Sequence, residues 1–154
     1  MAVSKKPRRK YNPMRRMHMV NRPSLNDCYQ VFAPVDDVFA SLEAGEIDSV
    51  QGVPVFRDRN GDLCEVSQAV EGWAAMWDRL CKGEGIVFNS KPLTKLAAKL
   101  RYNSPLTELE VAEAKAVVEM TRTMYMKLPI SVTREYARTE EIYIKLNTQQ
   151  REAA

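Results

Sequence analysis

Apolar residues recur three or four positions apart over most of this chain, which is the spacing of amphipathic helices. Five segments follow this pattern. Their residue ranges are 34–44, 67–81, 92–100, 104–127 and 133–148. Several have start signals, because Pro34 suits the first turn of a helix and Ser67 can cap one. We therefore predict about five helices, with residues 24–33 as a connection.

The segment 104–127 has the strongest start signal, since the capping residue Ser104 is followed by proline at the first helical position. Leu128-Pro129 is expected to end this helix. Its expected core-facing side chains are Leu106, Leu109, Ala116, Val117, Met120 and Met124.

A β-hairpin is predicted near residues 53–66, where two apolar runs flank a turn that contains Asn60-Gly61. Pro54 favours an edge strand because it has no backbone N–H to donate. A lone hairpin is marginally stable, so we expect it to pack against the helices. The fold class is therefore mainly α, with about five helices and one β-hairpin. We assign residues 24–148 to a single compact domain and expect 149–154 to fray.

The predicted helix at 67–81 places an aromatic face on the domain. Val70, Trp73, Trp77 and Leu80 share this face, and Met76 widens it. Tryptophan is highly buried on average, which favours a core position. The alternative is a partner-binding face formed by Trp73, Met76 and Trp77.

Charge divides the chain into two parts. The net charge of the whole is +3, yet residues 1–23 carry eight basic and no acidic residues. The remaining chain therefore holds 23 − 8 = 15 basic and 20 acidic residues, a net charge of −5. Three prolines in residues 1–23 disfavour a continuous helix there. We expect a flexible basic N-terminal arm followed by an acidic body.

A cluster of cations attracts polyanions and releases their counterions, which favours contact with RNA or DNA. Tyr11 could stack on an exposed base. The candidate nucleic-acid-binding residues are Lys5, Lys6, Arg8, Arg9, Lys10, Tyr11, Arg15, Arg16 and Arg22. Two simpler interpretations stay open: the arm improves solubility, or it folds back on the acidic body. A second basic stripe, at Lys91, Lys95, Lys99 and Arg101, is explained equally well by a solvated helix face.

No motif predicts catalysis, a cofactor or a metal site. The only histidine, His18, lies in the arm, and the chain has no phosphate-binding glycine loop and no HExxH zinc motif. Asp58, Asp62 and Glu65 are the nearest carboxylates for metal chemistry, but a polar turn explains them. Asp58 to Asp62 also fails as a calcium loop, because the closing ligand position is Ala69. We predict a protein that is not an enzyme.

The sequence also bears on location. No apolar run approaches the length of a membrane span, and the N-terminus lacks the apolar stretch of a signal peptide. Three cysteines at Cys28, Cys64 and Cys81 cannot all pair within one chain and are expected to be free thiols in a reducing cytoplasm. A homo-oligomer stays open.

The basic run from Lys5 to Lys10, followed by Tyr11-Asn12-Pro13, resembles the start of small uncharacterised proteins of tailed phages and prophages. The resemblance extends loosely to the Asn-Gly hairpin, Glu71-Gly72-Trp73 and Leu128-Pro129. It implies an accessory protein that acts in the cytoplasm of a bacterial host, and it transfers no activity. Two functions follow as hypotheses: a regulatory protein that contacts nucleic acid through the arm, or an inhibitor or adaptor that docks on a host protein through its acidic helical body.

Overall fold

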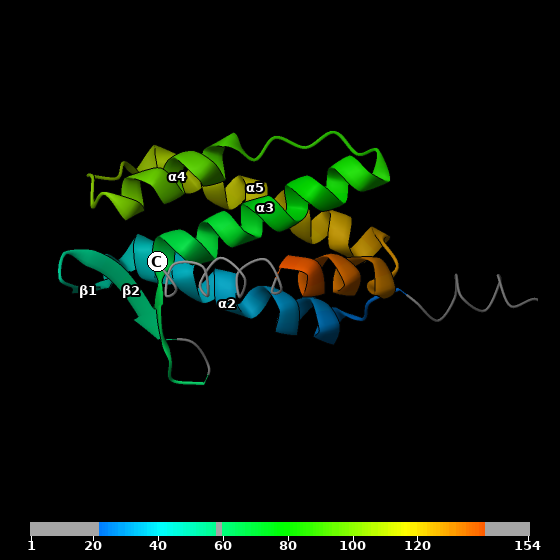
Figure 1. The fold of residues 1–154 in the computed structure, drawn as a ribbon, viewed down its shortest axis with the longest axis horizontal. Helices are drawn as coiled ribbons and strands as arrows, with labels where there is room; N and C mark the ends of the chain where they lie inside the picture. Colours follow the sequence, from blue (N-terminus) through cyan, green and yellow to red (C-terminus); the bar gives the residue numbers. More distant parts are fainter. Residues whose placement is uncertain (1–21, 58–59, 141–154) are drawn as a thin grey trace, which may run out of the picture.

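The computed structural model describes residues 22–57 and 60–140. Within them, the chain is mainly helical, with one small antiparallel sheet at one end of the helices (Figure 1). The elements are α2 (Leu25–Ala44), β1 (Asp48–Val50), β2 (Val53–Arg57), β3 (Leu63–Glu65), α3 (Val66–Glu84), α4 (Lys91–Arg101) and α5 (Glu108–Lys127). A last helical segment covers 130–140. The predicted fold class is confirmed.

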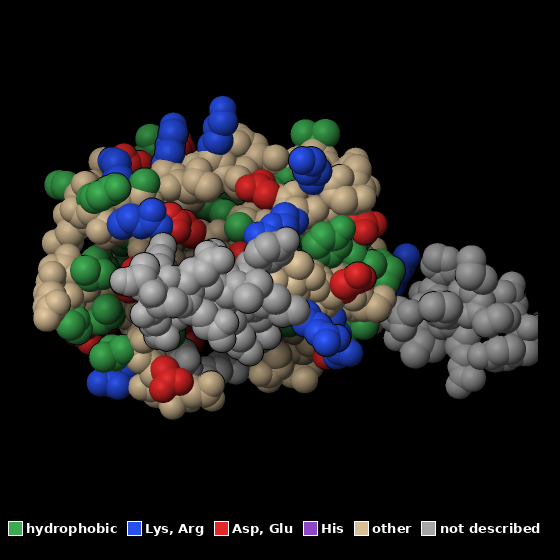
Figure 2. Space-filling view, viewed as in Figure 1, with side chains coloured by type: hydrophobic (Ala, Val, Ile, Leu, Met, Phe, Trp, Pro, Cys, Tyr) green, Lys and Arg blue, Asp and Glu red, His purple; other side chains and the backbone are tan. Residues whose placement is uncertain are grey.

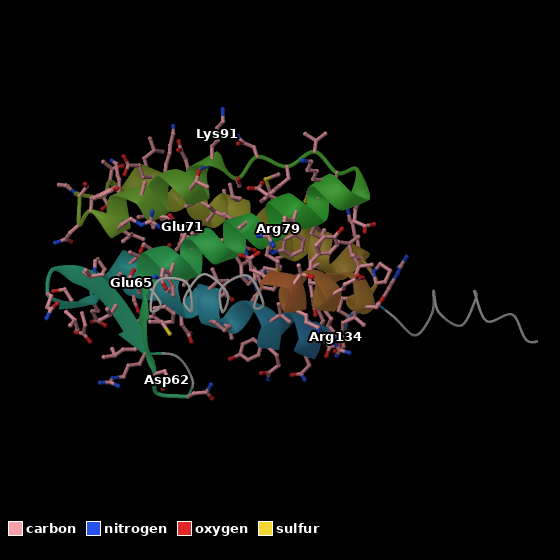
Figure 3. The ribbon with its side chains drawn as sticks, viewed as in Figure 1. Asp62, Glu65, Glu71, Arg79, Lys91 and Arg134 are labelled. Carbon is pink, nitrogen blue, oxygen red and sulfur yellow. The ribbon has the colours of Figure 1, made fainter. Side chains whose placement is uncertain are left out.

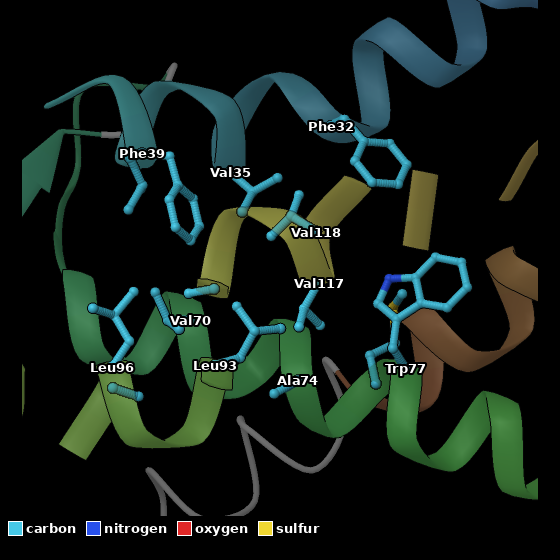
Figure 4. Close-up of a cluster of buried hydrophobic side chains, with 14 of the residues drawn as sticks. Phe32, Val35, Phe39, Val70, Ala74, Trp77, Leu93, Leu96, Val117 and Val118 are labelled. Carbon is cyan, nitrogen blue, oxygen red and sulfur yellow. The ribbon is translucent and has the colours of Figure 1, made fainter. Parts of the chain in front are cut away.

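The hydrophobic core lies where α2, α3, α4 and α5 meet (Figure 4). In this core α3 packs on α4, and α5 packs on both α2 and α4. The largest fully buried side chains come from all four helices and include Phe32, Trp77, Leu93, Leu96 and Tyr125. A mixed core of this kind holds the helices in one arrangement, because each helix supplies large side chains to the others.

The helix predicted at 34–44 begins earlier, at Leu25, so the expected connection at 24–33 is wrong. Ser24 caps α2, and it forms a reciprocal capping box with Asp27. These hydrogen bonds from the Ser24 backbone and hydroxyl lower the pKa of the Asp27 carboxyl. Pro34 lies inside the helix, where it removes one backbone hydrogen bond. Burial of Phe32, Ala33 and Val35 around it offsets that loss.

The long helix α5 starts at Glu108, and its cap is Thr107 rather than Ser104. Thr107 and Glu110 form a second capping box. The expected core stripe is confirmed only in part. Val117 is buried and Leu106 and Met124 pack against the core, whereas Leu109, Ala116 and Met120 are exposed. The side chains of α5 that the fold buries are Val111, Ala114, Val117, Val118, Thr121 and Tyr125.

The other helices follow the prediction more closely. The structure confirms α4 and its buried leucines. Helix α3 begins at Val66 after Glu65, so Ser67 is a buried residue of the first turn and not the cap. The last helix begins at residue 130 rather than Thr133, and its predicted part beyond residue 140 lies outside the described residues.

The predicted hairpin is confirmed as β2 and β3, and β1 adds a third strand that the sequence did not predict. Gln51 and Gly52 connect β1 to β2 with positive φ angles of 53° and 79°. The strand order β1-β2-β3 puts Pro54 in the central strand, opposite Ser49, so the predicted edge position is wrong. Helix α3 follows β3 directly, and this connection ties the sheet to the helical core.

Candidate functional site

The candidate nucleic-acid-binding residues of the arm lie outside the described residues, apart from Arg22. Arg22 is exposed, and the next residue, Pro23, is buried. The buried proline fixes the point at which the arm joins the body, just before the Ser24 cap of α2. In Figure 1 this junction lies at the end of the molecule opposite the sheet.

The aromatic face of α3 belongs to the core. Trp77 is fully buried and Met76 is 8% exposed, so neither side chain is available to a partner in this structure. Trp73 is half-buried, packs edge-on against Phe32 at 4.9 Å between ring centroids, and donates a hydrogen bond to Thr121 Oγ1 at 3.3 Å. These contacts assign the face to core packing, and the alternative of a partner-binding face at Trp73, Met76 and Trp77 is not supported.

Arg122 connects α5 to α2. Its guanidinium donates to Asp36 Oδ1 at 2.5 Å and to Glu119 at 3.2 Å, and it lies 4.5 Å from the centre of the Phe32 ring. Burial lowers the pKa of this group, but the hydrogen bonds to Asp36 and Glu119 outweigh burial and leave the pKa raised. This cation therefore stabilises the helix pair and is not free to bind phosphate.

Other cations of the body are also paired with its own acids. Arg79 contacts Glu140 at 2.8 Å, and Lys115 contacts Glu43 at 2.8 Å. In the basic stripe of α4, Lys99 pairs with Glu110 and Arg101 pairs with Glu71. The hydrogen bond from Lys99 lowers the pKa of the Glu110 carboxyl.

Half of the four-residue α4 stripe is thus neutralised within the fold. Figure 3 shows Glu71 and Arg79 on α3 and Lys91 at the outer edge of α4, and Figure 2 shows basic side chains spread over this face rather than gathered. The stripe therefore offers phosphate a much weaker field than its four cations suggest.

Two of the three carboxylates that the sequence offers for metal chemistry, Asp62 and Glu65, are among the described residues. Asp62 is exposed, Glu65 is the residue before α3, and Asp58 lies outside the described residues. In the part of the chain that the structure describes, no group of three or more metal-ligating side chains is close enough to hold an ion.

Cys28 and Cys81 are buried free thiols, and burial raises the pKa of Cys81. None of the described helices combines the length and apolar content of a membrane span.

A cavity lies between α2, α3, α5 and the last helix. Its volume is about 400 Å³, and its lining includes Trp73, Tyr125, Thr133 and Arg134. The buried hydroxyl of Thr133 has no hydrogen-bond partner among the described residues. The remaining walls of this cavity are mainly apolar, and it contains no arrangement of nucleophile and base.

A second hollow, which we call the acidic groove, lies at the other end of α2. It consists of two adjoining cavities of about 340 and 350 Å³ that share Leu42 and Leu106. Three exposed acids line it: Glu43, Asp48 and Glu108. The sequence does not predict this groove, because its residues come from the end of α2, β1, β2, the end of α4 and the start of α5 with the segment before it. The available signal was the run of acids around Gly45 with no basic residue in the last turn of α2.

Comparison of the chain with protein-family models, with curated proteins and with solved structures finds no match.

Proposed function

We propose that this chain is a non-enzymatic accessory or regulatory protein that contacts nucleic acid through its basic N-terminal arm, in the cytoplasm of a phage-infected or lysogenic bacterium. The observation that carries the proposal is the separation of charge: eight cations and no acid in residues 1–23, followed by an acidic body. Arg8, Arg9, Lys10, Arg15 and Arg16 supply most of the affinity.

The body supports this assignment because its acids outnumber its cations in the described residues. From residue 24 on, the described residues contain 12 basic and 17 acidic side chains, a net charge of −5. Five of these 12 cations are in ion pairs with acids of the same fold, namely Arg79, Lys99, Arg101, Lys115 and Arg122. Electrostatic attraction to a polyanion therefore has to come from the arm, because the body as a whole repels phosphate.

The physical mechanism is phosphate neutralisation. Each phosphate contact releases condensed counterions, so the logarithm of the binding constant falls with the logarithm of salt concentration by about 0.7 to 0.9 per contact. Tyr11 adds stacking on an exposed base, which favours single strands. The helical body supplies a fixed point from which the arm reaches its target.

The test is fluorescence anisotropy of labelled single-stranded RNA, single-stranded DNA and duplex DNA over a salt series. The full chain is compared with the variant Arg8→Gln/Arg9→Gln/Lys10→Gln. We expect this variant to bind more weakly and to reduce the salt slope by roughly 2 to 3, because up to three phosphate contacts are lost. A matched control, Lys91→Gln/Lys95→Gln on α4, should change affinity and slope much less. No binding by the full chain at low salt would contradict the proposal.

One observation favours a second function, docking of the body on a host protein. Leu109 and Met120 of α5 are 67% and 54% exposed, and the exposed Ala112 and Ala116 lie between them on the same side of the helix. Exposed apolar side chains along one helix can mark a protein-binding surface. Leu109→Gln/Met120→Gln should abolish capture of a specific host protein from bacterial lysate if this function holds. Unchanged capture would exclude this face.

A further inference from the structure

We propose that the acidic groove binds a segment of the same chain, Lys5–Tyr11 of the N-terminal arm, when no nucleic acid occupies that segment. This goes beyond nucleic-acid contact, since it assigns the arm a second binding site on its own body.

The groove combines an apolar floor with a negatively charged rim. Leu42 and Leu106 are half-buried, pack against the core and line both cavities, so they give the groove an apolar surface between α2 and the segment before α5. Pro54 and Leu100 extend this surface towards the sheet and α4. Figure 2 shows hydrophobic side chains gathered at this sheet end of the molecule. Such a floor can bind an aromatic or aliphatic side chain of an extended peptide.

The rim selects for positive charge. Glu43, Asp48 and Glu108 line the groove, and none of the described residues lining it is Lys or Arg. The C-terminus of α2, which is the negative end of the helix dipole, also lies at the groove, and the last turn of α2 contains no cation. Two local positive influences oppose this: Lys115 pairs with Glu43, and the amino end of α5 lies beside Glu108. The sum remains negative, so the groove fits a basic peptide.

The length of the arm determines which residues can reach the groove. The 20 residues of α2 separate the arm junction from the groove by about 30 Å, at 1.5 Å per helical residue. An extended chain covers at most about 3.3 to 3.6 Å per residue. Tyr11, which is 11 positions before Arg22, can therefore reach about 36 to 40 Å from it. Met14 can reach only about 26 to 29 Å from Arg22, short of the groove.

The segment that can reach is also the one with the matching chemistry. Residues 5–11 contain five cations, with Tyr11 as the only aromatic residue and Pro7 in the middle. The residue before a proline is biased towards extended conformations, which suits a peptide lying in a groove. We assign Tyr11 to the floor at Leu42 and Leu106, and the adjacent Arg9 and Lys10 to the acids of the rim.

Zero-length carbodiimide cross-linking of the full chain without nucleic acid tests this assignment. The reagent joins a lysine to a carboxylate only when the two are in contact, and mass spectrometry identifies the pairs. We expect Lys5, Lys6 and Lys10 to cross-link to Asp48 and Glu108, with a several-fold loss of yield at about 1 M salt because charge attraction is then screened within about 3 Å. Mixing ¹⁴N- and ¹⁵N-labelled protein shows whether each cross-link is within one chain.

Matched variants sharpen the result. Glu43, the third rim acid, already pairs with Lys115 and should give a weaker cross-link to the arm. Asp48→Asn/Glu108→Gln removes the other two rim acids and should abolish that weaker cross-link. Glu84→Gln/Glu135→Gln removes two exposed acids outside the groove and should leave the groove cross-links unchanged. Arm cross-links spread evenly over the body, or formed only between chains, would overturn the proposal. Because no nucleic acid is present, such a result leaves the proposed nucleic-acid contact to its own test.

Discussion

Two glycines of α3, at residues 72 and 83, have different surroundings. A Cβ atom on Gly72 would meet no atom within 4 Å, whereas one on Gly83 would collide with the hydroxyl of Tyr136. Gly72→Ala should therefore raise the free energy of unfolding by about 0.5 to 1 kcal/mol through helix propensity. Gly83→Ala should lower it by about 1 to 3 kcal/mol, because the last helix has to shift. Urea denaturation measures both.

The hydroxyl of Tyr136 provides the control for this pair. Tyr136→Phe removes the atom that would collide, and the next ring atom is 3.1 Å from the added Cβ. Gly83→Ala should therefore cost less stability in the Tyr136→Phe background than in the natural sequence. An equal cost in both backgrounds would show that the close approach of Gly83 and Tyr136 is not what requires glycine.

Arg122 is the cation whose loss should cost the most stability among the ion pairs described. Arg122→Ala leaves Asp36 without its partner and removes the contact with the Phe32 ring, so we expect a loss of about 2 to 4 kcal/mol, the sum of a charged hydrogen bond and a cation–π contact. Lys115→Ala is the matched control on the same helix. Its pair with Glu43 is about half exposed on both sides and should contribute less than about 1 kcal/mol. Similar losses for the two variants in urea denaturation would contradict this ranking.

At the level of elements, substitutions before α5 distinguish its observed cap, Thr107, from the predicted cap, Ser104. Thr107→Ala removes a side chain that accepts a hydrogen bond from the Glu110 backbone and should cost about 1 kcal/mol. Ser104→Ala, at the position favoured by the Ser-Pro pair, should cost much less because Ser104 lies outside the helix. Thermal or urea denaturation measures both variants, and a larger loss for Ser104→Ala would mean that α5 starts earlier in solution.

The elements show which signals in the sequence were reliable. Helix α4 was predicted well because Pro92 and four apolar residues at helical spacing agree. The start of α2 was missed because Pro34 is a strong start signal, yet packing of Phe32 and Ala33 keeps the helix intact through it. The strand β1 was missed because its three residues are all exposed and show no alternation. In α5, several apolar residues are available on more than one face, and only contact with α2 and α4 decides that Val118 is buried and Met120 is not.

At the scale of the whole molecule, the sequence indicates that charge is divided but not where the negative charge is concentrated. Glu43 and Asp48 are close together in the chain, but Glu108 belongs to a distant segment, and only folding brings the three acids around one apolar floor. The same limit applies to Trp77. Helical spacing is compatible with either a core position or a partner-binding face for this side chain, and the packing of the four helices places it in the core. Properties that depend on long-range contacts therefore had to come from the structure.

If the arm occupies the groove, nucleic acid and the groove compete for it. A binding segment that is free for only a fraction of the time has its apparent affinity reduced by that fraction. With the arm docked for about nine tenths of the time, Asp48→Asn/Glu108→Gln should tighten nucleic-acid binding by about tenfold at low salt. Removing two negative charges anywhere also helps binding, so Glu84→Gln/Glu135→Gln is the necessary comparison in the same anisotropy titration.

The two variants should differ most at low salt and converge as salt rises, because both the docking of the arm and its contact with phosphate are then screened. Equal tightening by both variants would mean that net charge alone controls affinity and that the groove does not compete. A specific effect of the groove acids would instead make the acidic body a regulator of the arm, since it withholds Lys5–Tyr11 until a polyanion displaces it.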